Sequence, residues 1–322
     1  MKVSFVIPCY RSEKTIERVY EEIIHVIKQR EGILYEIIAV NDCSPDKVLS
    51  VLIALASKDS NFKVIDCAKN MGKHAALMAG FRYTTGDYVV CVDDDYQCPV
   101  DRLWDLLSPL DEGYDVSMAQ YGKKKQSKFK NFGSRMNDWM MTYMIGKPKD
   151  FQFANFSAMK AFVVKEIIKY DNPYSYVNGL ILRSTNKIVN VKMEERSRLE
   201  GTGGYTFKKS IALWINGFTA FSIIPVRIAT YMGLIFSLFG FILGIIMIVR
   251  KFVSPFLGLG NGLVIAVIVF VGGILMVLMG ILGEYVGRIY ISINNSPQYV
   301  IRDTWNIEKE ENKYKCSGEY CE

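Results

Sequence analysis

Three consecutive aspartates, Asp93, Asp94 and Asp95, follow an apolar segment at residues 88–92 and are the residues best suited to chemistry. Side chains of alternate residues leaving a strand point the same way, so Asp93 and Asp95 can share one divalent cation. Carboxylates this close repel each other unless a positive charge lies between them. Mg²⁺ or Mn²⁺ would supply that charge and would also bind diphosphate oxygens. Taken alone, the triplet is equally well explained as a solvent-exposed acidic turn.

Alternating strands and helices are expected to hold this triplet at one edge of a sheet. The apolar pattern predicts strands at 2–7, 36–40, 62–67 and 88–92, with helices at 13–29, 46–57 and 73–83. This alternation favours a mostly parallel sheet with helices on both faces. Ligands of such sheets bind beyond the carboxyl ends of the strands, where the triplet and the polar loop at 41–46 lie. No G-x-G-x-x-G follows the first strand, so a dehydrogenase-type dinucleotide fold is not expected.

The most apolar part of the chain lies near its end. Residues 228–249 and 252–283 contain no charged side chain, and only Arg250 and Lys251 separate them. About 20 helical residues cross the hydrocarbon core of a bilayer, so we predict two transmembrane helices, at about 228–249 and 262–283. A two-helix hairpin puts both termini on one side, and the basic residues that flank it favour the cytoplasm. Buried core helices are the alternative, but they rarely run so long without charge.

The overall composition narrows the class of protein. Half of the 322 residues are apolar and 22% are charged, which excludes intrinsic disorder. The seven cysteines and two histidines form no metal-binding or disulfide pattern. Six basic residues and no acid lie in the segment 122–135 of a chain whose net charge is +6. This segment is either a solvated loop or a surface for anionic lipid or a phosphorylated substrate. Nucleic acid is not expected as a partner, because no binding motif accompanies the charge.

Five blocks of sequence, in order along the chain, resemble the family 2 glycosyltransferases of the GT-A fold. They are Val6–Glu13, Asn41–Asp46, Asn70–Asp87, Asp93–Pro99 and Gly283–Tyr299. The fourth block looks like the D-x-D-L-Q-x-P metal motif of that family. The fifth resembles the membrane-exit signature of bactoprenol-phosphate sugar transferases. The resemblance covers about residues 3–302 and implies a GT-A nucleotide-sugar-binding domain.

The resemblance also implies substrates: a nucleotide-sugar donor, with UDP the preferred nucleotide, and a polyprenyl phosphate such as undecaprenyl phosphate as acceptor. Carried over by position, the residues that would bind the nucleotide are Pro8, Tyr10, Glu13, Asp42 and Asp93.

The same resemblance implies a catalytic group made of Asp95, Arg198 and Asn155. Asp95 would be the main ligand of Mg²⁺ or Mn²⁺, with Asp93 and Gln97 completing the metal site. Arg198 begins a stretch similar to the family's R-x-x-G-x-S-x-Y motif near the phosphates. Its planar guanidinium suits that place because it can pair with phosphate in two positions.

Two amides depart from the family pattern. Asn41 replaces the usual first Asp of the second block, which leaves the base preference open. Asn155 stands where the family carries an Asp that is often taken as the general base, and an amide cannot accept a proton. A phosphate monoester has a second pKa of about 6 and is mostly ionised at neutral pH. We therefore expect Asn155 to be tolerated because the acceptor is a lipid phosphate, with the Asp150 carboxylate as the alternative.

These expectations define an organisation along the chain. A cytoplasmic GT-A catalytic domain covers 1–207, an interfacial amphipathic region 208–227, two transmembrane helices 228–283, and a cytoplasmic tail 284–322. The protein would lie in the inner or plasma membrane as a multi-pass protein, with the lipid bilayer as a partner. Glycines in the apolar segments, such as Gly233 and Gly240, would permit close helix packing and a homo-oligomer.

The expected function is inverting, metal-dependent transfer of a sugar from a UDP-sugar to polyprenyl phosphate, for modification of a cell-envelope glycan. One alternative is a membrane-bound glycosyltransferase with a non-phosphate glycan acceptor; a processive synthase of this kind usually carries Q-x-x-R-W, which this sequence lacks. The other alternative is a catalytically decayed membrane scaffold.

Overall fold

The computed structural model describes residues 1–122, 141–173, 175–194, 196, 224–253, 261–294 and 296–307. These residues separate into two compact units. Of the described residues, the first unit holds 1–122, 148–196 and 297–307, and the second holds 141–147 together with 224–296.

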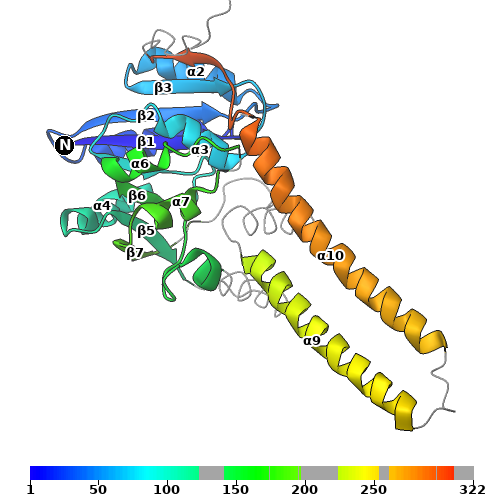
Figure 1. Ribbon diagram of the computed structural model, residues 1–322. Helices are drawn as coiled ribbons and strands as arrows, with labels where there is room; N and C mark the ends of the chain where they lie inside the picture. Colours follow the sequence, from blue (N-terminus) through cyan, green and yellow to red (C-terminus); the bar gives the residue numbers. More distant parts are fainter. Residues whose placement is uncertain are drawn as a thin grey trace, which may run out of the picture. The chain divides into compact units, whose positions relative to one another are not determined.

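An eight-stranded sheet forms the centre of the first unit (Figure 1). Its strands are β1 (Lys2–Cys9), β2 (Leu34–Asn41), β3 (Phe62–Cys67), β4 (Tyr88–Cys91), β5 (Val116–Tyr121), β6 (Ser157–Lys160), β7 (Ile188–Met193) and β8 (Ile301–Trp305). Their order across the sheet is β7-β5-β6-β4-β1-β2-β3-β8. The central strands β4, β1, β2 and β3 run parallel to one another, as do β5 and β7, whereas β6 and β8 pair antiparallel to their neighbours. The predicted α/β fold with a mostly parallel sheet is confirmed.

Helices cover both faces of this sheet. They are α1 (Ile16–Ile27), α2 (Val48–Lys58), α3 (Lys73–Phe81), the short η1 (Val100–Arg102), α4 (Leu103–Asp111), α6 (Ala161–Ile167) and α7 (Val177–Ser184). Alternate residues of β1 face opposite sides. Phe5 and Ile7 join the core formed with α1, α2 and α4. Val6 faces α3, where a Cβ at Gly80 would lie 2.5 Å from Val6 Cγ1, so this close packing requires glycine.

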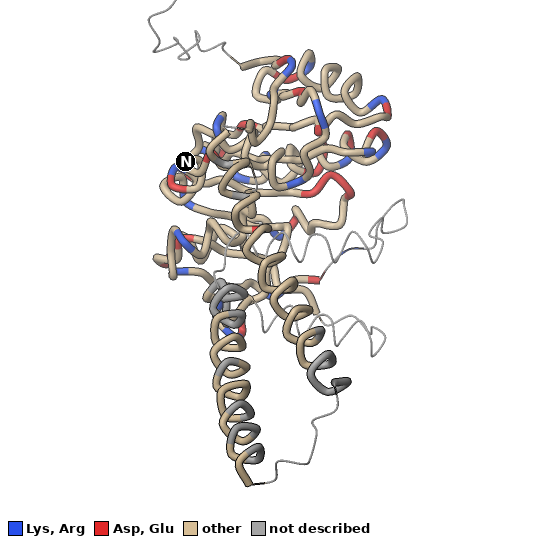
Figure 2. The backbone as a smooth tube through the Cα atoms, turned by 45° about the vertical axis from the view of Figure 1, so that its right-hand side comes forward, with Lys and Arg blue, Asp and Glu red and all other residues tan. Residues whose placement is uncertain are grey.

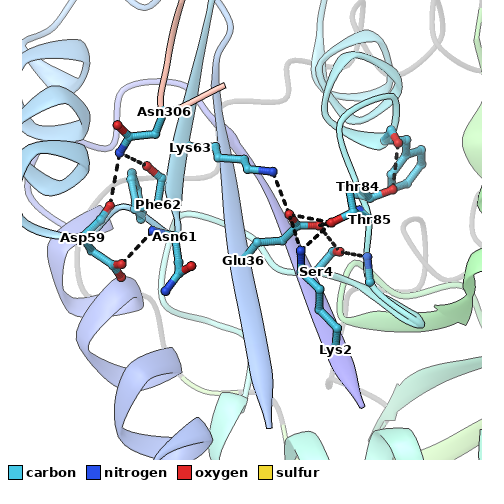
Figure 3. A network of polar contacts seen from close by, with 12 residues as sticks. Lys2, Ser4, Glu36, Asp59, Asn61, Phe62, Lys63, Thr84, Thr85 and Asn306 are labelled. Atoms are coloured by element: carbon cyan, nitrogen blue, oxygen red, sulfur yellow. Dashed lines mark hydrogen bonds and ion pairs between the residues drawn. The ribbon is translucent and has the colours of Figure 1, made fainter. Parts of the chain in front are cut away.

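A buried glutamate connects the amino-terminal halves of the central strands (Figure 3). Glu36 on β2 is 2% exposed and accepts hydrogen bonds from Ser4 Oγ on β1 at 2.5 Å, Lys63 Nζ on β3 at 2.7 Å and the Thr85 backbone N–H at 2.6 Å. Burial acts to raise the pKa of Glu36, but these hydrogen bonds outweigh it and lower the pKa to about 2. Glu36 is therefore ionised and ties three strands to the turn that precedes β4.

The last strand comes from the region that the sequence analysis places in a C-terminal tail. Residues Ile301–Trp305 form β8, which pairs antiparallel with the outer edge of β3. Asn306 follows β8, and its side-chain nitrogen donates to the carbonyl oxygens of Ala56, Asp59 and Phe62 at 2.7, 3.2 and 2.9 Å. Figure 3 shows the bonds to Asp59 and Phe62. The described end of the chain is thus part of the first unit.

The second unit contains two long helices, α9 (Ile224–Val253) and α10 (Asn261–Ile293). Figure 2 shows their described lengths mostly in tan, the colour of uncharged residues. One stretch of α10, Phe270–Ile291, has the length and the mean hydropathy of 1.8 that a membrane span needs, and none of it is buried in the structure. In α9 the apolar stretch found among the described side chains is Thr230–Ile242, which is part of the uncharged run at 228–249. Of the two predicted transmembrane helices, the described residues support one.

Candidate active site

The loops that follow β1 and β4 meet where the strand order of the sheet reverses. From β1 the chain adds β2 and β3 on one side, then returns to place β4 on the other side of β1. Open α/β sheets bind ligands at such a reversal, because the two connections leave in opposite directions and open a crevice at the carboxyl ends of the strands. The topology therefore brings the triplet after β4 to the loop that begins at Tyr10.

Backbone strain is concentrated in three loops at this edge. Arg11, Cys43 and Tyr96 follow β1, β2 and β4, and their φ angles are +58°, +49° and +64°. Residues other than glycine seldom adopt this left-handed conformation, and when they do they cluster at ligand sites. Among the described non-glycine residues only Asn306 shares it. The strained loops are those that the sequence analysis assigns to the nucleotide and the metal.

The middle aspartate of the triplet links two of these loops. Asp94 Oδ2 accepts the Tyr10 backbone N–H at 2.9 Å, and the Asp94 carbonyl oxygen accepts the Thr15 hydroxyl at 2.5 Å. Burial of Asp94, together with the charges of its two neighbours, raises its pKa to about 6. Asp94 thus fixes the loop after β1 to the loop after β4, while Asp93 and Asp95 flank it.

Both carboxylate oxygens of Asp93 have partners from distant parts of the chain. Lys73 Nζ, at the start of α3, forms an ion pair with Oδ1, and the Asn155 side-chain nitrogen donates to Oδ2 at 2.6 Å. Asn155 is exposed on the segment before β6. The structure therefore brings together Asp93 and Asn155, two of the predicted site residues, and adds Lys73, which the sequence analysis missed. The sequence did contain a signal for Lys73. This lysine begins a predicted helix that follows a parallel strand, and so it lies at the same edge of the sheet as the triplet.

Asp95 and Gln97 are organised by a segment that follows β7. The Gln97 backbone N–H donates to Asp95 Oδ1 at 3.2 Å, and its side-chain nitrogen donates to the Arg196 carbonyl oxygen at 3.2 Å. The Arg196 guanidinium pairs with Glu22 on α1 at 2.6 Å and with Asp101 on η1 at 2.5 Å. Gln97 therefore connects the metal loop to Arg196, a second residue that the sequence analysis missed.

The residues at this edge fit a hard divalent cation held by two carboxylates. Among the residues that the structure describes, no three His, Cys, Asp or Glu side chains are grouped as a metal site. Asp93 and Asp95 are two carboxylates on one turn, and Mg²⁺ or Mn²⁺ bound there would take its other ligands from diphosphate and water. The Lys73 ammonium beside Asp93 offsets part of the negative charge at this position.

Asp42 holds the start of α3. Its two carboxylate oxygens accept the backbone N–H groups of Met71 and Gly72 at 2.8 and 2.9 Å. Burial raises the pKa of Asp42, and the two hydrogen bonds oppose that shift. Gly72 has a φ of +88°, a conformation that glycine adopts without strain. Asp42 thus orders the loop that carries Lys73, and its contact with a nucleotide base stays a prediction.

Asn41 faces another acid, which accounts for its departure from the family pattern. Its side-chain nitrogen donates to Asp66 Oδ1 at 2.7 Å, and its Oδ1 accepts the Ser44 backbone N–H at 3.1 Å. Asp66 is 2% exposed, so an aspartate at position 41 would put two buried carboxylates in contact. Asn155 has the same relation to Asp93. Both amides supply a donor that an aspartate would lack.

The remaining predicted site residues are placed as follows. Pro8 is buried on β1, and the Tyr10 side chain is 44% exposed at the end of that strand. Glu13 Oε2 accepts the Lys47 backbone N–H at 2.9 Å and so joins the loops after β1 and β2. Asp150 is exposed, and no contact recorded for the described residues joins it to Asp93 or Asn155. Arg198, the six basic residues at 123–135 and the interfacial segment 208–223 lie outside the described residues.

Comparison with known proteins shows which family the sequence of the chain resembles. Residues 4–168 match Glycosyl transferase family 2. An undecaprenyl-phosphate 4-deoxy-4-formamido-L-arabinose transferase from Proteus mirabilis is 28% identical over 96% of this chain and 95% of its own length. A prophage bactoprenol glucosyl transferase homolog from Escherichia coli is 29% identical over 94% of this chain and 99% of its own. Glucosyl-3-phosphoglycerate synthase from Mycobacterium tuberculosis, crystallised with Mn²⁺ and UDP-glucose, has a similar fold, with a TM-score of 0.50 at 19% identity over 68% of this chain and 77% of its own.

Proposed function

The chain belongs to glycosyl transferase family 2, and we propose that this glycosyltransferase moves a sugar from a nucleoside diphosphate donor to a polyprenyl phosphate in the membrane. Relatives that span nearly the whole chain carry the names of undecaprenyl-phosphate and bactoprenol transferases. Their similarity extends beyond residue 168 into the apolar segments, which supports an acceptor of the same lipid class. UDP as the nucleotide and an inverting reaction for an envelope glycan belong to this proposal.

The observation that carries the acceptor assignment is the hydrogen bond between Asn155 and Asp93. Asn155 occupies the position where the family resemblance places a general base, and its amide donates to Asp93 at 2.6 Å. A hydroxyl acceptor needs a base to remove its proton, whereas a phosphate monoester is mostly ionised at neutral pH. The site therefore suits an acceptor that arrives already charged.

The proposed reaction is a single displacement. An oxygen of the acceptor phosphate attacks the anomeric carbon and forms the new C–O bond. The bond from that carbon to the diphosphate breaks on the opposite face, and the nucleoside diphosphate leaves with the bonding electrons. No proton has to move. Asp95 with Asp93 would hold Mg²⁺ or Mn²⁺, which when bound supplies positive charge to the leaving diphosphate.

The chain's own residues arrange the reactants. Lys73 lies beside Asp93 and supplies a fixed positive charge at the diphosphate end of the site. Asp94 keeps the loop after β1 in register with the metal loop. Arg198 would add a second positive group, as the family resemblance implies. Holding both reactants in line lowers the entropic part of the barrier, which supplies much of the rate enhancement in such transfers.

A polyprenyl tail does not leave the bilayer, so the enzyme must work at its surface. The apolar stretch Phe270–Ile291 of α10 supports anchoring of the chain in a membrane. The proposal also includes a second membrane span within α9. It places the catalytic unit in the cytoplasm and the protein in a homo-oligomer.

The decayed-scaffold alternative explains the site less well. Decay would leave Asn41 and Asn155 without specific partners, yet each amide donates to one aspartate at 2.7 Å and 2.6 Å.

The test uses the full chain in detergent with undecaprenyl phosphate, a panel of UDP-sugars and Mn²⁺, followed by mass analysis of the lipid. We expect a glycosylated polyprenyl phosphate, and no product when unphosphorylated polyprenol replaces the acceptor. Equal transfer to polyprenol would overturn the acceptor assignment. Absence of UDP binding with either metal would overturn the donor assignment.

A further inference from the structure

A row of polar contacts crosses the carboxyl edge of the sheet, and it begins on the strand that follows the last helix. Arg302 on β8 lies with Nη1 3.5 Å from Asp66 Oδ2, and its Nη2 donates to the Ala68 carbonyl oxygen at 3.2 Å. Asp66, near the end of β3, is almost completely buried, whereas Arg302 is about half exposed. Arg302 is therefore the positive charge that neutralises Asp66 from the edge of the sheet.

The row continues from Asp66 to the strained loops. Asp66 Oδ1 accepts the Asn41 amide at 2.7 Å, and Asn41 Oδ1 accepts the Ser44 backbone N–H at 3.1 Å. Ser44 Oγ in turn accepts the Arg11 backbone N–H at 2.8 Å. Four hydrogen bonds or ion pairs thus connect β8 with the loop after β2 and the loop after β1.

Because Asp66 is charged, the contacts from Asp66 to the loops after β2 and β1 depend on Arg302. A buried carboxylate is costly unless it is paired and hydrogen-bonded. Without Arg302, Asp66 would keep only neutral donors such as the Asn41 amide. The carboxylate would then turn toward water, and Asn41 would lose the acceptor that fixes its orientation. The Ser44 backbone N–H would then lose its hydrogen bond to Asn41 Oδ1.

We propose that β8 is a working part of the nucleotide site, and that Arg302 is a positioning residue that orders the loop at 41–46 through Asp66 and Asn41. The inference rests on the proposed function only in naming a nucleoside diphosphate as the ligand of that loop. Residues 297–307 belong to the unit that contains the site, although they follow α10 in the chain. The segment that leaves the last helix therefore completes the site rather than ending the protein as a tail.

Asn306 provides a matched control on the same segment. Its side chain makes three hydrogen bonds to carbonyl oxygens of Ala56, Asp59 and Phe62, around α2 and the start of β3. Arg302 contacts the opposite, carboxyl end of β3. Loss of Asn306 weakens the docking of the C-terminal segment without touching the Asp66 row. Asn306→Ala thus tests weaker docking of β8, whereas Arg302→Ala tests loss of order in the loop at 41–46.

The experiment measures UDP affinity by calorimetry, acceptor KM and amide hydrogen exchange on the full chain in detergent. Arg302→Ala should weaken UDP binding about tenfold, the size expected for a charged hydrogen bond, and speed exchange at 41–46. Acceptor KM should stay within about twofold, and Arg302→Lys should restore most of the affinity. Asn306→Ala should lower the melting temperature and leave UDP affinity within about twofold. In an Asp66→Asn background, Arg302→Ala should have little further effect.

Two results would overturn the inference. One is an unchanged exchange rate at 41–46 in folded Arg302→Ala. The other is an equal loss of UDP affinity in Asn306→Ala, which would reduce Arg302 to strand docking. If the wild-type chain binds no UDP, the donor assignment fails, and the exchange measurement still decides the ordering role of Arg302.

Discussion

Replacement of Asn155 by aspartate tests the proposed acceptor chemistry most directly. The substitution restores the carboxylate that the family resemblance places at this position, with almost no change in side-chain size. It also converts the hydrogen bond from Asn155 to Asp93, 2.6 Å long, into a contact between two acidic oxygens. If the acceptor were a hydroxyl, the new carboxylate would supply the missing base. If the acceptor is a phosphate, the carboxylate only adds negative charge where an anion must bind.

The expected loss of activity in Asn155→Asp can be estimated from the contact between the new carboxylate and Asp93. Two unit charges about 4 Å apart repel by about 1 kcal/mol in water and by about 4 kcal/mol at an effective dielectric constant near 20. The Asp93 side chain is 16% exposed, so the cost lies toward the upper figure, and the Lys73 ammonium offsets part of it. A net cost of about 1.4 kcal/mol corresponds to a tenfold change in rate. We therefore expect Asn155→Asp to lower kcat/KM for polyprenyl phosphate about tenfold at neutral pH.

The assay is the initial rate of sugar transfer to polyprenyl phosphate as a function of pH. The wild-type rate should rise as the acceptor ionises around pH 6 and then level off, because no protein base is required. Gln152→Glu is the control: it adds the same charge three residues earlier, at an exposed position whose backbone bonds to Asn190, and it should change the rate little. A rate tenfold above wild type in Asn155→Asp would refute the reasoning, because the site would then be shown to lack a base that it needs.

Three further predictions concern the scaffold. Gly86→Ala should destabilise the protein by about 1–3 kcal/mol in chemical unfolding, because its Cβ would lie 2.6 Å from Ser4 Oγ and 2.9 Å from the Ser4 backbone nitrogen; unchanged stability would contradict this packing. Glu36 has a pKa of about 2 against an ordinary 4.5, so its stabilisation is complete above pH 4.5 and is lost as the pH falls toward 2. Glu36→Gln should therefore cost about 3 kcal/mol at pH 7 and flatten the stability profile over that window, and an unaltered profile would show that the network does not stabilise the charge. Asp94→Ala removes the acceptor of the Tyr10 N–H and should weaken UDP binding, whereas Asp94→Asn retains an acceptor and should bind within about threefold of wild type; equal losses in the two variants would assign Asp94 a role through its charge instead.

Local pattern was sufficient for the centre of the sheet. The predicted strand 62–67 has the bounds observed for β3, and the other three predicted strands differ from β1, β2 and β4 by three residues or fewer at either end. Buried parallel strands are nearly continuous apolar runs, so they stand out from the polar loops between them. The predicted helices at 13–29 and 73–83 correspond to α1 and α3, which end a few residues earlier. The strands β5, β6, β7 and β8 were not predicted, because their pairing is decided by partners that are distant along the chain.

The membrane segments show what composition alone does not predict, namely the ends of the helices. Uncharged runs indicated two spans, and among the described residues one stretch, Phe270–Ile291, has the length and hydropathy of a span. Helix α10 extends to Ile293, beyond the charged Glu284 that ended the predicted span. The absence of charge identifies an apolar run, but it does not give the ends of the helix that contains the run.

The sequence by itself determined the chemical types at the site: a triplet of acids after one strand, polar loops after two others, and two amides at positions where the family resemblance places acids. Only the tertiary structure decided what those residues contact. Lys73 and Asp93 are 20 residues apart and meet because the chain returns past β1 between β3 and β4. Asn155 and Asp93 are 62 residues apart and meet because β6 pairs antiparallel with β4, with Cys91 opposite Ser157. Arg302 reaches Asp66 because β8 pairs with the open edge of β3. Such pairings follow from the order of the strands in the sheet, which side-chain periodicity along the chain does not encode.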